Sequence, residues 1–135
     1  MNTVLFDLDG TLLPMDQEAL IRLYFGALTQ KFEPYGFDPQ KLIQGLWAGM
    51  KAMQENDGSK TNEDVFWQAF TGLAGERALV YRSDFDAFYR NEFAAAKKAT
   101  VCHPMAARCV HLLREKGYRV ALATNPLFPQ AATWA

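Results

Sequence analysis

Hydrophobic and polar positions divide the chain into two short apolar runs and a long series of helical stripes. Residues 3–6 form an apolar run that ends at Asp7, and residues 118–123 form another that ends at Thr124. Both runs are typical of short buried strands. Between them, apolar residues recur at helical spacing in five stretches, about residues 16–32, 38–53, 62–73, 83–96 and 103–116. The last stretch leads directly into the second strand, which is typical of a parallel α/β fold.

Polar residues mark several of the predicted helix starts. Thr61 with Asp64, and Ser83 with Asp86, have the spacing of a capping box and are predicted to begin the third and fourth helices. His103 precedes a proline at the start of the fifth helix, where we expect a capping or surface role and not catalysis.

The two predicted strands lie more than a hundred residues apart in the sequence. A crossover between parallel strands needs only about a dozen residues or more. Residues 15–100 are therefore expected to form an inserted helical bundle, while residues 1–14 and 101–135 form the sheet domain. The aromatic residues on the helical stripes are predicted to fill the core of the bundle: Trp47, Phe66, Trp67, Phe70, Phe85, Phe88 and Phe93.

Two acids directly after the first strand are the strongest sign of chemistry in the chain. Asp7 and Asp9 are two residues apart, so in an extended chain both carboxylates face the same side. Two anions that close repel each other, and a bound cation relieves the repulsion. Oxygen ligands at this spacing suit Mg²⁺. Gly10 then allows a sharp turn of the backbone just past the strand.

A calcium-binding loop is an alternative interpretation of the same stretch. Asp7, Asp9, Thr11 and Glu18 occupy positions 1, 3, 5 and 12 of an EF-hand template. Position 6 of that template requires glycine, however, and Leu12 stands there. A strand is also predicted before the loop where the template has a helix, so we consider this interpretation weak.

Composition and charge narrow the range of partners. The chain has 14 Lys and Arg against 15 Asp and Glu, which gives no sign of nucleic-acid or anionic-membrane binding. No apolar run approaches the roughly 18 residues of a membrane span. The first residues already form a strand, so we expect no signal peptide. Cys102 and Cys109 are expected to be reduced thiols, and the cytoplasm is the predicted compartment.

The stretch Asp7-Leu8-Asp9-Gly10-Thr11 resembles the first motif of the haloacid dehalogenase-like (HAD) hydrolases, an apolar strand followed by D-x-D-x-[TV]. The strand ending in Ala123-Thr124-Asn125 resembles the family's second motif, a strand that ends in Ser or Thr. A helical insertion directly after the first motif is the cap type called C1. The resemblance therefore implies an α/β fold, with a partial Rossmann-like parallel core and an inserted α-helical C1 cap.

The resemblance also implies roles for the two acids. Asp7 would attack phosphorus and form an aspartyl-phosphate, and Asp9 would protonate the leaving oxygen and then activate water. Mg²⁺ would be held by the Asp7 carboxylate and by the backbone carbonyl of Asp9.

Four further residues would complete the site by the same resemblance. The Thr124 hydroxyl and backbone N–H groups near Leu8 and Asn125 would bind the phosphoryl oxygens. Thr11 belongs to the same motif and is expected to position Asp9. The site would act on a small phosphorylated metabolite, and the oligomeric state stays open.

The second acid separates the activities known in the family. Expulsion of an alkoxide needs a proton donor, whereas expulsion of a halide does not, and the family's dehalogenases lack this acid. Asp9 therefore favours phosphate-ester hydrolysis. A phosphomutase uses the same pair of acids and stays an alternative, as does a non-catalytic binding protein with the HAD fold.

The third and fourth motifs of the family, a Lys or Arg and then an acidic pair, follow the second motif. Residues 126–135 contain no acid and no base, so neither motif lies there. We therefore expect the 135 residues to be the first part of a longer protein and to be inactive alone.

Overall fold

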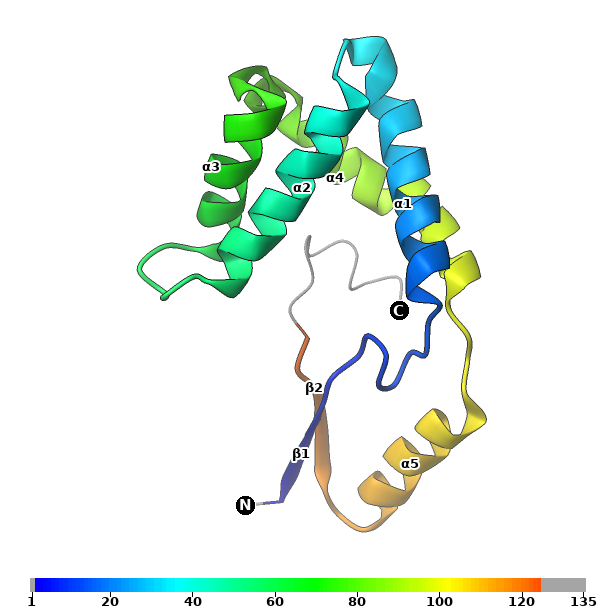
Figure 1. Cartoon of the computed structure of the whole chain (residues 1–135). Helices are drawn as coiled ribbons and strands as arrows, with labels where there is room; N and C mark the ends of the chain where they lie inside the picture. The colour runs from blue at the N-terminus through cyan, green and yellow to red at the C-terminus, as the bar shows by residue number, and fades with distance from the viewer. Residues whose placement is uncertain (1, 125–135) are drawn as a thin grey trace. The chain divides into compact units, whose positions relative to one another are not determined.

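The structure is a computed structural model, and it describes residues 2–124. Figure 1 labels the helices and strands; η denotes a 3₁₀ helix. In chain order they are β1 Thr3–Phe6, α1 Gln17–Phe32, η1 Glu33–Tyr35, α2 Pro39–Gln54, α3 Asn62–Ala74, η2 Glu76–Tyr81, α4 Arg82–Arg90, η3 Glu92–Ala99, α5 Pro104–Glu115 and β2 Arg119–Leu122.

Contacts between residues divide the chain into two compact units. We call Met1–Tyr24 with Phe93–Ala135 the strand unit, and Phe25–Glu92 the helical unit. The boundary falls inside α1, so this helix belongs in part to each. Each unit is described by itself below.

The strand unit contains a parallel pair of strands. β1 and β2 pair in register from Thr3 with Arg119 to Phe6 with Leu122, and Figure 1 shows them side by side although they are far apart in the sequence. α5 precedes β2 and contacts it, as expected for a helix that leads into a parallel strand. Together with the helices, this small sheet is compatible with part of an α/β fold.

The two strands are not buried, which corrects one expectation. Leu5 is 65% exposed and Leu122 is 49% exposed. One face carries Thr3, Leu5, Arg119 and Ala121, and all four are exposed. Among the described residues the sheet has only two strands, so too few elements flank it to cover both faces.

Two short segments of the strand unit run antiparallel where the long helical stretch begins and ends. Met15 pairs with Thr100. The N–H of Asp16 donates to the carbonyl of Ala99 at 2.9 Å, and the N–H of Val101 donates to the carbonyl of Pro14 at 2.9 Å. These bonds tie together two segments that are about 85 residues apart in sequence.

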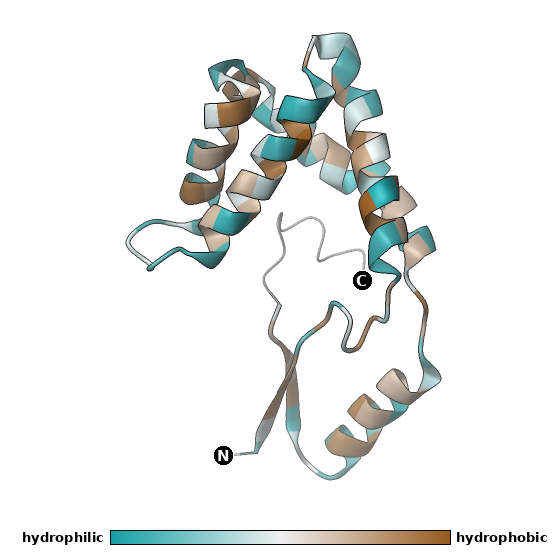
Figure 2. Cartoon of the chain, viewed as in Figure 1, coloured by the Kyte–Doolittle hydropathy of each residue, from teal (hydrophilic) through white to brown (hydrophobic). Residues whose placement is uncertain are grey.

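The helical unit is built around aromatic side chains. Phe85 stacks on Phe32 with ring centroids 4.0 Å apart, and it makes T-shaped contacts with Phe37, Trp67 and Phe70. Figure 2 shows that hydrophobic and hydrophilic residues are interleaved along these helices, as an amphipathic bundle requires. The buried apolar residues of this unit are Leu28, Phe32, Phe37, Leu42, Leu46, Met53, Phe66, Trp67, Phe70, Ala78, Phe85, Phe88 and Tyr89.

Trp47 and the fourth helix differ from the sequence-based expectation. Trp47 is 48% exposed and does not belong to the core. The expected helix over residues 83–96 ends at Arg90, because Asn91 leaves helical geometry and η3 follows. Ser83 lies inside α4 and does not begin it. The capping role of Thr61 is confirmed: the Asp64 N–H donates to the Thr61 hydroxyl at 3.1 Å, and that hydroxyl donates to Oδ2 of Asp64 at 2.7 Å.

Candidate active site

The two sequence motifs meet at one edge of the sheet. Asp7 directly follows β1, and Thr124 follows β2 by two residues. Parallel pairing brings both strand ends to the same edge, and the Ala123 N–H extends the pairing by donating to the Phe6 carbonyl at 2.7 Å. Thr124 is half-buried beside this point. Asn125, which was assigned to the same site, lies outside the described residues.

A tight turn after Asp7 is fixed by backbone hydrogen bonds. The carbonyl of Leu8 accepts from the N–H of Thr11 at 3.1 Å and from the N–H of Leu13 at 2.9 Å, and the Gly10 N–H donates to the Leu13 carbonyl at 3.0 Å. Gly10 has φ of 76°, a left-handed conformation that glycine adopts without strain. Within residues 2–124, this network does not use the N–H of Leu8 or the carbonyl of Asp9.

The hydroxyl of Thr11 contacts Asp7 and not Asp9. It donates to Oδ2 of Asp7 at 3.0 Å. In this structure the Thr11 hydroxyl thus meets a different acid from the one that it was expected to position. The turn explains the difference, because it brings residue 11 back toward the end of the strand, where Asp7 lies. Spacing in the sequence alone did not indicate which acid the hydroxyl would meet.

The two acids do not have the same environment. Asp9 is exposed as a residue, yet its carboxyl group is partly withdrawn from solvent, and this partial burial raises its pKa above the ordinary value of 3.8. The negative charge of Asp7 raises the pKa of Asp9 further. Asp9 therefore keeps its proton to a higher pH than a free aspartic acid does.

The chemistry of the donor set fits a weakly held magnesium ion. Magnesium is commonly bound through one or two carboxylates while it keeps several waters and takes oxygens from a phosphorylated substrate. Asp7 supplies one carboxylate, and the Asp9 backbone carbonyl is outside the turn's hydrogen bonds. Among the described residues, no three His, Cys, Asp or Glu side chains gather to form a closed metal site.

The same observation argues against a calcium loop. Glu18 lies in the first turn of α1 and does not join Asp7 and Asp9 in a ligand group among the described residues. An EF-hand loop requires its twelfth residue as a bidentate ligand.

His103 has the capping role expected for it, because its Nδ1 accepts the N–H of Met105 at 3.2 Å.

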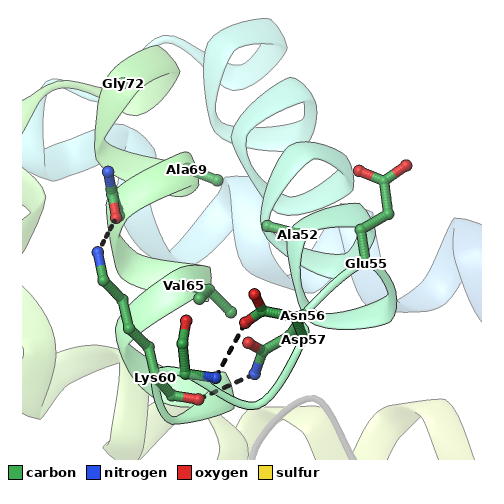
Figure 3. A pocket seen from close by; sticks show the side chains of 10 residues that line it. Ala52, Glu55, Asn56, Asp57, Lys60, Val65, Ala69 and Gly72 are labelled. Carbon is green, nitrogen blue, oxygen red and sulfur yellow. Dashed lines mark hydrogen bonds between the residues drawn. The ribbon is translucent and has the colours of Figure 1, made fainter.

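A shallow hollow on the helical unit contains none of these residues. It lies between α2 and α3, and Figure 3 shows the side chains that line it. Its polar groups bond to one another: Lys60 donates to Gln68 at 3.2 Å, and Asn56 donates to the Lys60 carbonyl at 3.0 Å. With these groups already paired, the hollow presents no converging set of free polar groups of the kind a small-molecule site needs.

Comparison with known proteins identifies the family. The family model described as haloacid dehalogenase-like hydrolase matches residues 1–134, nearly the whole chain. The chain therefore belongs to the haloacid dehalogenase-like hydrolases, as the resemblance of its motifs predicted. No curated protein and no solved structure matches it. None of the helices in the described part of the chain is both long and apolar enough to cross a membrane.

Proposed function

We propose that the protein is a Mg²⁺-dependent phosphatase that hydrolyses a small phosphorylated metabolite through an aspartyl-phosphate. The observation that carries this proposal is the pair of acids at the end of β1, of which Asp9 has a raised pKa beside Asp7. A displacement at phosphorus with acid assistance requires one carboxylate as nucleophile and a second carboxyl group beside it that can donate a proton.

Asp7 is the nucleophile in this proposal. It is exposed at the carboxyl end of its strand, where open α/β sheets bind ligands. A carboxylate oxygen of Asp7 forms a bond to phosphorus while the bond between phosphorus and the ester oxygen breaks. Water then attacks the phosphorus of the aspartyl-phosphate, which releases phosphate and restores Asp7.

Asp9 is the general acid and base. Its raised pKa favours the protonated form that donates to the leaving oxygen. After that transfer Asp9 is a carboxylate and can accept the proton of the attacking water. Because a dehalogenase needs no such donor, Asp9 also supports phosphate-ester hydrolysis over dehalogenation.

The remaining groups would bind the phosphoryl oxygens. The N–H of Leu8 lies outside the turn's hydrogen bonds, and the Thr124 hydroxyl lies at the same sheet edge. These donors, with an N–H at Asn125, are proposed to stabilise the charge that develops on those oxygens. Bound by Asp7 and the Asp9 carbonyl, Mg²⁺ would neutralise the phosphoryl charge.

We also propose that residues 15–100 are a C1 cap and that residues 1–14 and 101–135 belong to the catalytic core. The support is the connectivity: the helical stretch begins directly after the first motif, and its two ends are hydrogen-bonded to each other through Asp16 and Val101. Replacing residues 17–98 by a short linker tests this assignment. Discrimination among substrates should be lost while a small aryl phosphate still phosphorylates Asp7.

The test of the reaction uses the protein expressed from its native gene and two substrates. Asp7→Asn should abolish Mg²⁺-dependent turnover of an aryl phosphate, and it should abolish an acid-stable, base-labile phosphoenzyme. Asp9→Asn should reduce turnover of an alkyl phosphate far more than that of nitrophenyl phosphate, whose leaving group needs less protonation. Glu18→Gln, which removes an exposed acid of α1, is the matched control and should keep full turnover.

The outcomes also separate the alternatives. Substantial turnover by Asp7→Asn would contradict the proposed nucleophile, and equal losses on both substrates would contradict the acid role of Asp9. Phosphoenzyme that passes its phosphoryl group to a second hydroxyl of the substrate faster than to water would identify a phosphomutase. Phosphate binding without any phosphoenzyme would favour a non-catalytic binding protein.

A further inference from the structure

We infer that Thr11 is a positioning residue that holds the Asp7 carboxylate for attack and does not bind substrate; this inference rests on the proposed function. The hydrogen bond from the Thr11 hydroxyl to Oδ2 of Asp7, at 3.0 Å, is the observation that carries it. This hydrogen bond assigns Thr11 a role different from the one expected from the motif, which was to position Asp9.

The backbone of the turn places Thr11 where this bond can form. The Leu8 carbonyl accepts two N–H groups, those of Thr11 and Leu13, and so closes the chain back on the end of β1. The left-handed Gly10 allows the reversal within the three residues that separate Asp7 from Thr11. The hydroxyl therefore reaches Asp7 from a backbone that is itself fixed, and it does not depend on a flexible loop.

A count of donors excludes a simultaneous contact with substrate. A threonine hydroxyl has a single proton to donate, and here the proton is directed at Asp7. A phosphoryl oxygen offers only lone pairs, so it would have to compete with Asp7 for this proton. Among the hydrogen bonds of residues 2–124, none engages the Leu8 N–H or the Thr124 hydroxyl, so these two donors do not face this competition.

The bond makes the two oxygens of Asp7 unequal. Oδ2 accepts the hydrogen bond from the Thr11 hydroxyl and thereby becomes less electron-rich. Oδ1 accepts no hydrogen bond from Thr11, so its lone pairs stay available to attack phosphorus. The bond also restricts rotation of the exposed side chain. The side chain of the nucleophile therefore loses part of its rotational entropy when the protein folds, and this loss does not add to the barrier of each turnover.

Thr11→Val and Thr11→Ser are the variants that test this role. Valine keeps the shape of threonine and removes the hydroxyl, whereas serine keeps the hydroxyl and removes the methyl group. With an aryl phosphate and Mg²⁺, Thr11→Val should lower kcat about ten- to a hundredfold, the loss expected from one hydrogen bond to a charged group. Its KM should change by less than about twofold, and Thr11→Ser should recover most of kcat.

The split between kcat and KM decides between the two roles. A raised KM with unchanged kcat in Thr11→Val would mean that the hydroxyl binds substrate, and it would overturn the inference. Equal losses in Thr11→Val and Thr11→Ser would also overturn it, because the hydroxyl would then not be the group that matters.

Crystal structures of the same variants separate this inference from the proposed function. If the unaltered protein turns over no phosphate ester, the proposed function fails, but the orientation of Asp7 can still be observed. Asp7 should adopt a single rotamer in the unaltered protein and in Thr11→Ser, and more than one in Thr11→Val. A single unchanged rotamer in Thr11→Val would overturn the inference even where turnover is normal.

Discussion

The helical unit and the strand unit are held together by different interactions. Among the described residues, every buried apolar side chain except Tyr24, Ala96 and Ala99 belongs to the helical unit. The strand unit has an exposed two-stranded sheet, and its candidate site is fixed by backbone hydrogen bonds around Leu8 and Gly10. The buried core thus lies mainly in one unit, while the candidate site lies in the other.

This separation follows from the physical needs of each region. Aromatic rings that interlock exclude water and stabilise one packing arrangement, but they leave no group free to react. In the proposed function Asp7 and Asp9 need access to solvent, a cation and a substrate, and they lie at a strand end where little is buried. The raised pKa of Asp9 shows that the second arrangement has an electrostatic cost.

The largest expected difference between the units comes from removing one core ring. Phe85 is 1% exposed and contacts four other rings, so Phe85→Ala should reduce the free energy of unfolding of the helical unit by about 4 kcal/mol. The matched substitution in the strand unit is Leu5→Ala at a side chain that is 65% exposed, which should cost no more than about 0.5 kcal/mol.

Hydrogen exchange measured by mass spectrometry reports each unit separately, so one melting temperature need not describe both. Peptides of α2 and α3 should lose protection in Phe85→Ala. Comparable losses in Leu5→Ala would contradict the view that the core of the helical unit dominates stability.

Two helix glycines should respond in opposite directions to the same substitution. A Cβ at Gly49 of α2 would lie 2.4 Å from Cδ2 of Phe66, and the Phe66 ring is buried and stacked on Phe70. Overpacking of this kind destabilises a protein by about 1–3 kcal/mol. The higher helix propensity of alanine offsets about 1 kcal/mol of this loss. Gly49→Ala should therefore destabilise the protein by about 1 kcal/mol.

Gly26 of α1 is the control, because a Cβ there meets no atom within 4 Å. Gly26→Ala should stabilise the protein by about 0.5–1 kcal/mol in denaturant unfolding. If Gly49→Ala were as stabilising as Gly26→Ala, α2 and α3 could not be packed as closely as the structure describes.

The glycine pair also marks the limit of what the sequence predicts. The strands, five helices and the capping of Thr61 follow from local patterns of apolar and polar residues, because those patterns act within a few residues. That Gly49 admits the ring of Phe66 depends on how two helices meet. The same limit explains why Trp47, on an apolar stripe, is nonetheless exposed.

The candidate site was predictable to a similar depth. Asp7, Asp9 and Thr124 could be selected because each follows a strand and carries a side chain that suits phosphate chemistry. The partner of Thr11 could not be selected, because it depends on the path of the turn between Leu8 and Leu13. The early end of the fourth helix at Arg90 likewise arises from the backbone at Asn91, where no strong helix breaker such as proline or glycine stands.

An ion pair in the helical unit should contribute less than the core. Lys31 donates to Glu92 at 2.7 Å, and the two side chains are 27% and 37% exposed. Burial acts to raise the pKa of Glu92, but the hydrogen bond from Lys31, a backbone hydrogen bond at Glu92 and the charge of Lys31 together outweigh it and lower that pKa. The hydrogen bond to Glu92 raises the pKa of Lys31. Since both side chains are partly screened by solvent, Glu92→Gln should cost about 0.5–1 kcal/mol at pH 7.

The sign of the Glu92 shift fixes the pH dependence of that cost. A carboxyl whose pKa is lowered in the folded state stabilises the fold above its unfolded value of 4.5, and this contribution disappears as the pH falls through the lowered pKa. The difference between Glu92→Gln and the unaltered protein should therefore shrink at pH 3. Glu55→Gln is the control, because its pairing with Lys51 at 3.8 Å is exposed and should contribute nothing measurable.

The smallest expected effect is at Asp9 and has the opposite sign. Its pKa is raised in the folded state by partial burial and by Asp7. The corresponding stability is present below the ordinary value of 3.8 and is lost as the pH rises through the raised pKa, because ionised Asp9 is disfavoured in its site. Asp9→Asn, neutral and of the same shape, should therefore stabilise the protein at pH 7 by on the order of a few tenths of a kcal/mol, after allowance for screening by solvent.

Measurements at a second pH and on a second aspartate test whether this small effect is electrostatic. At pH 3 Asp9 is itself neutral, so the gain from Asp9→Asn should vanish in denaturant unfolding at that pH. Asp57 is the control of opposite sign, since hydrogen bonds from Ser59 lower its pKa, and Asp57→Asn should not stabilise the protein at pH 7. Magnesium should stabilise the unaltered protein more than it stabilises Asp9→Asn. A bound cation removes the repulsion between Asp7 and Asp9, and in Asp9→Asn that repulsion is already absent. A gain for Asp9→Asn that persists unchanged at pH 3 would show that the gain does not come from ionisation of Asp9, and it would contradict the electrostatic cost assigned to the strand unit.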